Sequence, residues 1–590
     1  VMLEVLSFPI HRYLDLCLTQ NIFFPCSGIH VDSPPTTPTL TTSYAHGTTN
    51  ASLVHTTVGE TLLRTVERWP DREAMAFLEG GVRKTFAAFQ QDVDRAAAGL
   101  LALGLTKGDR LGMWGPNTYE WVLFQFATAK AGIILVSVNP AYQLQEAEYA
   151  LRKVGCKAIV CLTQFKTQKY CDMLRRLCPE IETSSPGDIR SARLPDLRSV
   201  IVLDSRQPGM LHFDDVMQAG GSQHVQQLQD LQKKISFDDP INIQFTSGTT
   251  GAPKGATLSH FNIVNNAYTV GKRPHTRICL PVPLYHCFGS VGGGICMAVH
   301  GVSLIDSVIL CVFHERCTFI YGTPTMYVDM INQPDLAKYD FSSVEAGIMA
   351  GSPCPPEVVK QVISLMGIKQ ITIGYGTTEN SPVTFCAGPM DNMDRKSETV
   401  GYIMDHMEAK IVNPTTGEVL PLGELGEIMI RGYCVMQEYW NDRAKTEECI
   451  TQSGWYKTGD IGSLDAYSYL RIEGRIKDMI IRGGENIYPA EIEQFLHTHP
   501  KVKEAQVVGV QDSRMGEEVC ACIKLADGEE CTPEEIKAYC KGQIAHFKIP
   551  RYILFVTSYP LTITGKVRLL PSSKDKQEKQ CEARGNYTAR

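Results

Sequence analysis

One stretch of the chain combines glycine, hydroxyl and cationic side chains in a way that suits phosphate binding. The segment Phe245–Gly255 holds three glycines, four Ser or Thr residues, one proline and one lysine. Glycines let backbone N–H groups turn toward an anion, hydroxyl groups donate hydrogen bonds, and the lysine adds a positive charge. A Walker A loop is excluded, because Lys254 follows Pro253 and is itself followed by glycine instead of Ser or Thr. A flexible Gly/Thr hairpin is the alternative interpretation.

Four shorter motifs follow this stretch and carry residue types that are common in nucleotide sites. They are YGTTE at 375–379, TGD at 458–460, EGRIKD at 473–478 and TITGK at 562–566. Taken singly, each motif is weak, because a lone tyrosine or glutamate usually packs in a core or faces water, and an isolated TGD can be a turn. Their significance therefore depends on their occurring together.

Together the five motifs resemble those of the adenylate-forming superfamily, which includes acyl-CoA synthetases, firefly luciferase and adenylation domains. The signature TSGTTG-x-PKG is highly specific, its companions occur in the family's order, and the resemblance covers about residues 58–567. Stretches such as VSVNPAY, YGTPTM and DMIIRGGENIYPAE are most similar to mitochondrial medium-chain acyl-CoA synthetases. The resemblance implies that a carboxylate attacks the α-phosphorus of ATP to give acyl-AMP and pyrophosphate. The CoA thiol then displaces AMP.

The resemblance implies binding roles for the phosphate loop and for residues near adenine. Tyr375 would offer a flat face to adenine, and Gly376 belongs to the same nucleotide-binding motif. The turn at Gly351 and Ser352 corresponds to another adenine-contacting segment, although a plain Pro-rich loop explains that turn nearly as well. The β- and γ-phosphates would be wrapped by nine consecutive residues: Thr246, Ser247, Gly248, Thr249, Thr250, Gly251, Ala252, Pro253 and Lys254.

Carboxylates in two of the motifs are expected to hold magnesium and ribose. By resemblance, Thr378 lies near the α-phosphate and Glu379 is the Mg²⁺ ligand, since magnesium takes one or two carboxylates plus substrate phosphates. Asp460 would accept both ribose hydroxyl groups, because one carboxylate can receive two O–H donors. Arg475, fifteen residues further on, would join it near the ribose and phosphate. That spacing favours the functional interpretation of Asp460 over a turn.

The resemblance also predicts that two surfaces of a small C-terminal domain serve the two half-reactions. Lys566 would neutralise charge that develops in the transition state of the first half-reaction, and no base is needed because the nucleophile is already a carboxylate. Arg482, Gly483 and Gly484 would contact the pantetheine of CoA. Both surfaces cannot face the active site at once, so the family rotates this domain about a hinge, which aligns with Lys477.

The segment 283–301 is expected to line the acyl site. His286 matches the position where the family places an aromatic residue or histidine beside the carboxylate. The glycines at 292–294 fall in an expected helix, where each costs about 1 kcal/mol relative to alanine. Bare backbone along an apolar acyl channel would justify that cost, and close packing of helices is the alternative. A hydrophobic fatty acid fits these surroundings better than an amino acid.

The pattern around these motifs predicts an α/β fold. Helical periodicity at 86–100 and 119–130 alternates with apolar β-rich runs at 110–114, 133–138, 159 onward and 200 onward. Such runs indicate parallel strands covered by helices on both faces. Near the C-terminus, two strand-like runs precede Thr532, which begins a capping box completed by Glu535. We expect a large N-terminal domain of mostly parallel sheets and a small, mobile α+β domain.

The expected domain limits follow from these elements. Residues 1–57 are interpreted as a disordered leader or targeting segment, 58–476 as the large AMP-binding domain, 477–570 as the small domain and 571–590 as a polar tail. The resemblance implies the mitochondrial matrix, although the N-terminus is not a clear transit peptide; the cytoplasm is the alternative location. No apolar run reaches the roughly 18 residues that span a bilayer, so no transmembrane segment is expected.

Composition restricts the partners. The net charge is −7 with 57 basic and 64 acidic residues, and no long basic run exists, so nucleic acid is not expected as a partner. Twenty cysteines are scattered without a C-x-x-C pair, which favours core thiols in a reducing compartment over zinc or disulfides. Fatty acid, ATP, Mg²⁺ and CoA are the expected ligands, and the oligomeric state stays open.

Three departures from the family pattern leave competing hypotheses. The segments 267–280 and 302–317 are shorter than usual, and the loss of part of a covering helix in the second could expose apolar surface. The tail after Lys566 lacks the usual terminal helix pattern. A fatty acid–CoA ligase remains the leading hypothesis. A nucleotide-binding isoform without turnover is the second, and an adenylation enzyme that loads another acceptor is the third; no carrier domain follows here.

Overall fold

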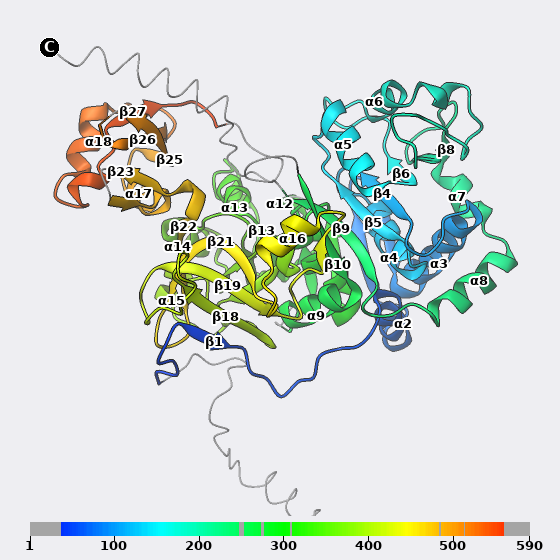
Figure 1. Ribbon diagram of the computed structural model, residues 1–590, viewed down its shortest axis with the longest axis horizontal. Helices are drawn as coiled ribbons and strands as arrows, with labels where there is room; N and C mark the ends of the chain where they lie inside the picture. The colour runs from blue at the N-terminus through cyan, green and yellow to red at the C-terminus, as the bar shows by residue number, and fades with distance from the viewer. Residues whose placement is uncertain are drawn as a thin grey trace, which may run out of the picture.

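The computed structural model describes residues 37–246, 253–272, 276–306, 309–482, 485–512 and 514–559. Figure 1 shows a large body built around three sheets and a small C-terminal unit at one end of it. The predicted α/β class, with mostly parallel sheets covered by helices and a separate small α+β unit, is confirmed.

An eight-stranded sheet carries the N-terminal part of the large body, in the order β20-β10-β9-β5-β4-β6-β7-β8. Strands β9, β5, β4, β6, β7 and β8 run parallel, and β10 and β20 follow as antiparallel strands. The strand bounds are β4 Arg110–Trp114, β5 Ile134–Val138, β6 Ala158–Cys161, β7 Ser199–Val202, β8 Leu211–His212, β9 Pro240–Thr246, β10 Lys254–Ser259 and β20 Glu438–Tyr439.

Helices cover both faces of this sheet, as the apolar strand runs predict. Alternate side chains of β5 illustrate this: Leu135 packs into one core, and Val136 packs into another. The first core includes α3 and α4, and the second includes α5 and α6. The helices are α3 Phe86–Ala102, α4 Tyr119–Lys130, α5 Leu144–Val154, α6 Tyr170–Leu177, α7 Phe213–Ala219, α8 Ser222–Gln232 and α9 His260–Val270.

A nine-stranded sheet forms the second layer, in the order β17-β16-β15-β14-β13-β11-β12-β2-β3. Its central strands from β15 to β2 are parallel. The strands are β2 Glu73–Phe77, β3 Val82–Thr85, β11 Arg277–Cys279, β12 Ser303–Asp306, β13 Phe319–Gly322, β14 Ala346–Met349, β15 Gln370–Gly376, β16 Val383–Cys386 and β17 Tyr402–Ile403. The helices around it are α2 Val58–Arg68, α10 Cys287–Gly289, α11 Cys296–His300, α12 Ile309–His314, α13 Pro324–Ile331, α14 Pro356–Met366 and α15 Met393–Glu398.

A five-stranded antiparallel sheet, β1-β18-β19-β21-β22, completes the large body. Its elements are β1 Tyr44–His46, β18 Met407–Val412, β19 Gly426–Gly432, β21 Tyr456–Leu464 and β22 Leu470–Arg475, with α16 Arg443–Cys449 nearby. Strand β1 corrects the expectation of a disordered leader up to residue 57. Tyr44–His46 pairs with β18, and Ser43 and Ala45 are buried. The prediction of disorder is therefore wrong for Tyr44–His46, because pairing with a strand that is distant in the sequence orders them; the targeting alternative for residues 1–57 stays a prediction.

The small unit is an α+β domain with its own apolar core. It contains β23 Ile480–Arg482, β24 Glu485–Ile487, α17 Pro489–Leu496, β25 Val502–Asp512, β26 Gly516–Leu525, α18 Pro533–Cys540 and β27 Tyr552–Phe555. The capping box of α18 is confirmed, since Thr532 Oγ1 accepts a hydrogen bond from the backbone N–H of Glu535 at 3.3 Å, and Glu535 Oε2 accepts one from the N–H of Thr532 at 2.6 Å. The core of this unit begins at Ile480, whereas Ile472 packs with the large body.

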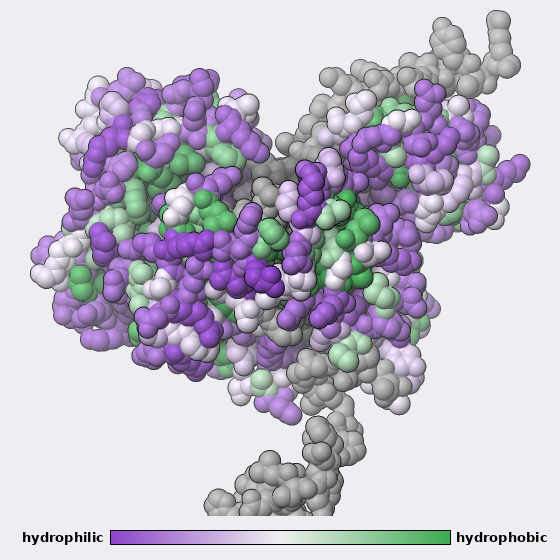
Figure 2. All heavy atoms as spheres, turned by 180° about the vertical axis from the view of Figure 1, so that it is seen from behind, coloured by the Kyte–Doolittle hydropathy of each residue, from purple (hydrophilic) through white to green (hydrophobic). Residues whose placement is uncertain are grey.

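The shortened connection at 302–317 still contributes to the core. Val312 in α12 and Cys317 are buried, whereas Phe313 is 36% exposed. Among the side chains that the structure describes between residues 302 and 317, Phe313 is the exposed large apolar one. Figure 2 shows that hydrophilic residues dominate the visible face, with apolar ones in separate small groups. In the described part of the chain, no helix is long and apolar enough to cross a membrane.

Candidate nucleotide and acyl site

The candidate site lies at the carboxyl ends of parallel strands, where open α/β sheets bind ligands. β14 and β15 are parallel neighbours, so the turn at Gly351 and Ser352 and the motif that begins at Tyr375 leave the sheet at the same edge. Gly376 must be glycine, because a Cβ there would collide with the carbonyl oxygen of Pro382. The sheet therefore brings these predicted adenine-side residues to one edge.

The phosphate stretch joins two antiparallel strands. Thr246 at the end of β9 pairs with Lys254 at the start of β10, and residues 247–252, which hold six of the predicted phosphate-binding positions, lie outside the described residues. Ser259 caps the following helix α9, accepting a hydrogen bond from the N–H of Asn262 at 3.2 Å. The stretch is thus preceded by a strand and followed by a capped helix. Lys254 occupies a strand, which agrees with the exclusion of a Walker A loop.

Tyr375, Asp460 and Arg475 form what we call the Asp460 cluster. The Tyr375 hydroxyl donates to Asp460 Oδ2 at 2.7 Å, and Arg475 Nε lies 3.2 Å from Asp460 Oδ1. The fifteen-residue spacing is explained by the sheet, since Asp460 on β21 faces Arg475 on β22 directly. Burial raises the pKa of the Asp460 carboxyl, whose residue is only 6% exposed, and Arg475 and the Tyr375 hydroxyl oppose that shift.

Lys254, Tyr439 and Glu379 form what we call the Tyr439 cluster. Lys254 Nζ donates to the Tyr439 hydroxyl at 3.0 Å and lies 4.2 Å from the centroid of its ring. The Tyr439 hydroxyl in turn donates to Glu379 Oε1 at 2.7 Å. Glu379 is 8% exposed, and its neighbour Thr378 is partly exposed at the start of the helical turn Thr378–Asn380.

Tyr439 is a site residue that the sequence motifs miss. It lies on the two-residue strand β20, outside the five motifs. Burial and the nearby Glu379 carboxylate raise its pKa, so its hydroxyl keeps its proton at neutral pH. Only the pairing of β20 with β10, which places Ala256 opposite Tyr439, brings it beside Lys254.

The donor set around Glu379 suits a magnesium ion that arrives with phosphates. Among the described residues, no group of three or more His, Cys, Asp or Glu side chains is placed to hold a metal. Mg²⁺ typically takes one or two carboxylates and completes its shell with substrate phosphates and water. A single buried carboxylate that is linked through Tyr439 to Lys254, the last residue of the predicted phosphate-binding stretch, fits that pattern.

In the expected acyl segment 283–301, glycines allow neighbouring side chains to pack closely. His286 lies just before α10, and its ring centroid is 4.2 Å from that of Tyr285. The glycines occupy the π-helical turn Ser290–Ile295. A Cβ on Gly293 would collide with Leu280, and one on Gly294 would press on Gln125. Close packing, the alternative hypothesis, therefore accounts for these two glycines, and the acyl channel along the segment stays a prediction.

The small-domain candidates are only partly described. Arg482 Nε lies 2.5 Å from Glu518 Oε2, and Arg551 Nη1 lies 3.1 Å from Glu518 Oε1. Glu518 is buried, so it fixes the Arg482 guanidinium on β23. Lys477 lies in the turn Ile476–Asp478 between the two cores. Gly483, Gly484 and Lys566 lie outside the described residues.

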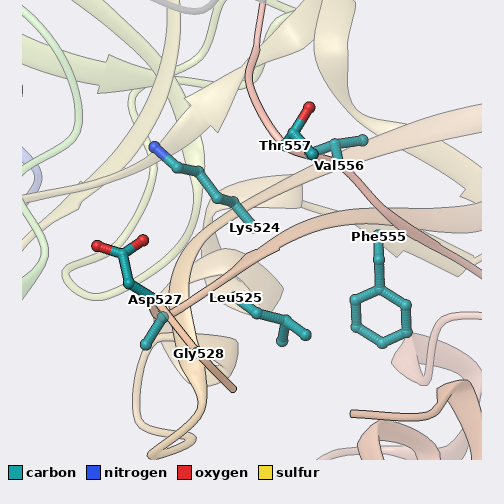
Figure 3. Close-up of a pocket in the computed structure, with 8 residues that line it drawn as sticks. Lys524, Leu525, Asp527, Gly528, Phe555, Val556 and Thr557 are labelled. Atoms are coloured by element: carbon teal, nitrogen blue, oxygen red, sulfur yellow. The ribbon is translucent and has the colours of Figure 1, made fainter. Parts of the chain in front are cut away.

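A groove of about 420 Å³ opens on the small domain, at the ends of β26 and β27. Figure 3 shows its lining, which includes Lys524, Asp527, Phe555 and Thr557. Lys524 Nζ is paired with Glu504 at 2.7 Å. None of the predicted site residues lines this groove.

Known proteins share these features. Residues 62–440 match the family described as AMP-binding enzyme, and residues 491–566 match the AMP-binding enzyme C-terminal domain. The chain is 69% identical to a zebrafish (Danio rerio) protein named medium-chain acyl-CoA ligase ACSF2, mitochondrial, over 92% of both chains. The human (Homo sapiens) protein of that name is 55% identical over 92% of this chain and 91% of its own.

A solved structure agrees with the sequence relatives. The ATP-bound MatB of Rhodopseudomonas palustris is 26% identical and covers 89% of this chain and 99% of its own, with a TM-score of 0.75. The resemblance predicted from the five motifs is confirmed. With family matches over most of its length and relatives of this similarity, the chain belongs to the AMP-binding enzyme family.

Proposed function

We propose that this protein is an AMP-forming acyl-CoA ligase that activates medium-chain fatty acids. The fatty-acid carboxylate attacks the α-phosphorus of ATP, forming acyl-AMP and releasing pyrophosphate. The CoA thiol, losing its proton, then attacks the acyl carbon, forming acyl-CoA and releasing AMP. The observation that carries the proposal is the meeting of the Asp460 and Tyr439 clusters around the motif 375–379. The names of the curated relatives support the medium-chain preference and a mitochondrial location.

The residues of the two clusters bind different parts of the nucleotide. Asp460, held by Arg475, accepts the ribose hydroxyl groups, and Tyr375 lines the adenine together with the turn at Gly351 and Ser352. Lys254 and the rest of the 246–254 stretch bind the β- and γ-phosphates. Thr378 lies beside the α-phosphate, and Glu379 is the residue that would hold Mg²⁺. When bound, magnesium supplies neutralisation of phosphate charge.

The acyl and CoA groups are served by other segments. His286 orients the fatty-acid carboxylate, which needs no base because it is already the nucleophile. Lys566 balances the charge of the first transition state, and rotation about Lys477 then presents the segment 482–484 to the pantetheine of CoA. Glu518 forms an ion pair with Arg482, which holds the first residue of that segment in place.

The alternative hypotheses make a contrary prediction. An isoform impaired by its shortened segments would bind ATP without turnover, and an adenylation enzyme with another acceptor would form acyl-AMP but ignore CoA. The intact hydrogen bonds of both clusters argue against the first. We expect pyrophosphate release from ATP with carboxylic acids of graded chain length, highest for medium-chain acids, and acyl-CoA formation when CoA is added. ATP binding without release for any acid would reject the ligase function.

Lys566 provides the sharper test of the two half-reactions. Because its charge acts only on the phosphoryl-transfer transition state, Lys566→Ala should stop pyrophosphate release. Thioester formation from supplied acyl-AMP and CoA should continue. Equal loss of both half-reactions would contradict the proposed rotation of the small domain.

A further inference from the structure

The Tyr439 cluster places a neutral hydroxyl between a cation and a carboxylate. Lys254 Nζ donates to the hydroxyl at 3.0 Å, and the hydroxyl donates to Glu379 Oε1 at 2.7 Å. A direct ion pair between lysine and glutamate would be strong in such a partly buried place, since low dielectric strengthens attraction between charges. Binding of phosphates and magnesium would then have to break that pair. The intervening hydroxyl keeps the two charges apart while it fixes both side chains.

Tyr439 is itself rigidly held, which is a requirement for positioning other groups. It is 1% exposed. Its backbone N–H donates to Thr446 Oγ1 at 2.9 Å, and the N–H of Trp440 donates to the carbonyl of Gly255 at 2.8 Å. The carbonyl of Glu379 is also tied, since it accepts from the N–H of Met436 at 2.7 Å. The segment that carries Tyr439 is therefore attached both to β10, which follows the phosphate loop, and to the Glu379 turn.

We propose that Tyr439 is a positioning residue for adenylation, which orients Glu379 toward the magnesium of the bound nucleotide and keeps Lys254 beside the phosphates without pairing the two charges directly. The proposal rests on the proposed function, and it adds a residue from outside the five motifs. Its effect is confined to the step that uses ATP and magnesium, because thioester formation follows the departure of pyrophosphate.

Tyr439→Phe removes the hydroxyl and keeps the ring that lies beside Lys254. We expect the affinity for ATP in the presence of Mg²⁺, measured by titration calorimetry, to fall about tenfold, which corresponds to about 1.4 kcal/mol. With EDTA in place of Mg²⁺, the affinity should change less than twofold. Pyrophosphate release should slow by about the same factor of ten, whereas thioester formation from supplied acyl-AMP and CoA should keep its wild-type rate.

Tyr469→Phe is the matched control. Tyr469 is also 1% exposed, and its hydroxyl donates to a buried carboxylate, Asp391 Oδ1, at 2.6 Å. Neither residue belongs to the candidate site. This variant should lower the melting temperature to a similar extent as Tyr439→Phe and should leave magnesium-dependent ATP binding and the ratio of the two half-reactions at the wild-type values.

A double variant tests whether Tyr439 acts through Glu379. Contacting residues that act together give non-additive effects, so Tyr439→Phe should add less than twofold to the loss caused by Glu379→Gln. Full additivity, or equal slowing of both half-reactions by Tyr439→Phe, would overturn the proposal in favour of a purely structural role. If Tyr439→Phe leaves magnesium-dependent ATP binding at the wild-type level, the proposal is likewise wrong. Absence of pyrophosphate release by the wild type would reject the proposed function, and the binding titrations would still decide the role of Tyr439.

Discussion

The Asp460 cluster and the Tyr439 cluster use the same three kinds of side chain, a cation, a tyrosine and a carboxylate, in different orders. In the Asp460 cluster the carboxylate is in the middle and receives both the tyrosine hydroxyl and the arginine. In the Tyr439 cluster the tyrosine hydroxyl is in the middle and separates lysine from glutamate. The order decides whether the carboxylate and the cation neutralise each other directly or whether both charges stay available to a ligand.

The difference matches the ligand that each cluster is proposed to bind. Ribose is uncharged, so it needs a fixed acceptor, and a carboxylate held from two sides provides one. Phosphates and magnesium are charged, so they need a cation and an anion that are not already paired with each other. The two arrangements thus suit a neutral and a charged part of the same nucleotide, and variants can test each separately.

Gly376→Ala should have the largest effect, because it disturbs both clusters. Gly376 lies between Tyr375 and Glu379, and a Cβ would collide with the carbonyl oxygen of Pro382. Moving the chain apart would displace both side chains from their partners. We expect ATP binding to fall below detection in titration calorimetry and the unfolding free energy to drop by about 2 kcal/mol. Wild-type affinity in this variant would show that the close approach at Pro382 is not needed.

Asp460→Ala should break the Asp460 cluster alone. It removes the proposed ribose acceptor and leaves Arg475 and the Tyr375 hydroxyl without their shared partner. We expect ATP affinity to fall about a hundredfold, since hydrogen bonds to a charged group contribute on the order of 2 kcal/mol each. The wild type should prefer ATP to 2′-deoxy-ATP, and the variant should bind both equally. A variant that still distinguishes the two nucleotides would place the ribose elsewhere.

Glu379→Gln should break only the charged end of the Tyr439 cluster. The amide oxygen can still accept from the Tyr439 hydroxyl, but the negative charge is gone. We expect about tenfold weaker ATP binding with Mg²⁺ and unchanged binding with EDTA, because magnesium takes carboxylate oxygen in preference to neutral oxygen. Titration in both buffers gives the answer. Equal loss in both buffers would show that Glu379 contacts the nucleotide by itself.

The sequence was sufficient for the parts of the site whose neighbours are near in the chain. Asp460 and Arg475 are fifteen residues apart on adjacent antiparallel strands and face each other directly. Tyr439 could not be found in this way, because its partners Lys254 and Glu379 are 185 and 60 residues distant. Its strand is too short to give a periodic signal.

At two other places the structure differs from the sequence-based expectation, again because of contacts between residues that are distant in the chain. Polar composition suggested disorder up to residue 57, yet Tyr44 donates to Glu408 Oε2 at 2.5 Å across 364 positions. The glycines at 292–294 suggested bare backbone, whereas Leu280 and Gln125 fill the space beside Gly293 and Gly294. In both cases a neighbour that is remote in sequence decides the local structure. The roles of residues 247–252, Gly483, Gly484 and Lys566 stay predictions, since these positions lie outside the described residues.

Asp460→Asn should show by how much the buried carboxylate lowers the free energy of unfolding when no ligand is bound. Burial raises the pKa of Asp460 in the folded state, so the folded protein holds this proton at pH values where the unfolded chain has released it. The unfolding free energy therefore falls as pH rises from the ordinary carboxyl value through the folded pKa, and it stays lower above that point. The asparagine variant should be more stable than the wild type at pH 7, by on the order of 1 kcal/mol. The difference should shrink toward pH 4 in urea titrations, and lower stability of the variant at pH 7 would contradict the direction of the shift.

Tyr375→Phe should have the smallest effect, and it completes the comparison with Tyr439→Phe. Both changes remove one hydroxyl that donates to a carboxylate at 2.7 Å. In the Asp460 cluster the tyrosine hydroxyl is at one end and the carboxylate is in the middle, so Arg475 still holds the carboxylate in the variant. Phenylalanine also still offers a flat face to adenine. We expect ATP affinity to fall only about threefold, within the range for one ordinary hydrogen bond, and to the same extent with Mg²⁺ and with EDTA. A loss of ATP affinity as large and as magnesium-dependent as that of Tyr439→Phe would mean that the order of the three side chains in a cluster has no consequence.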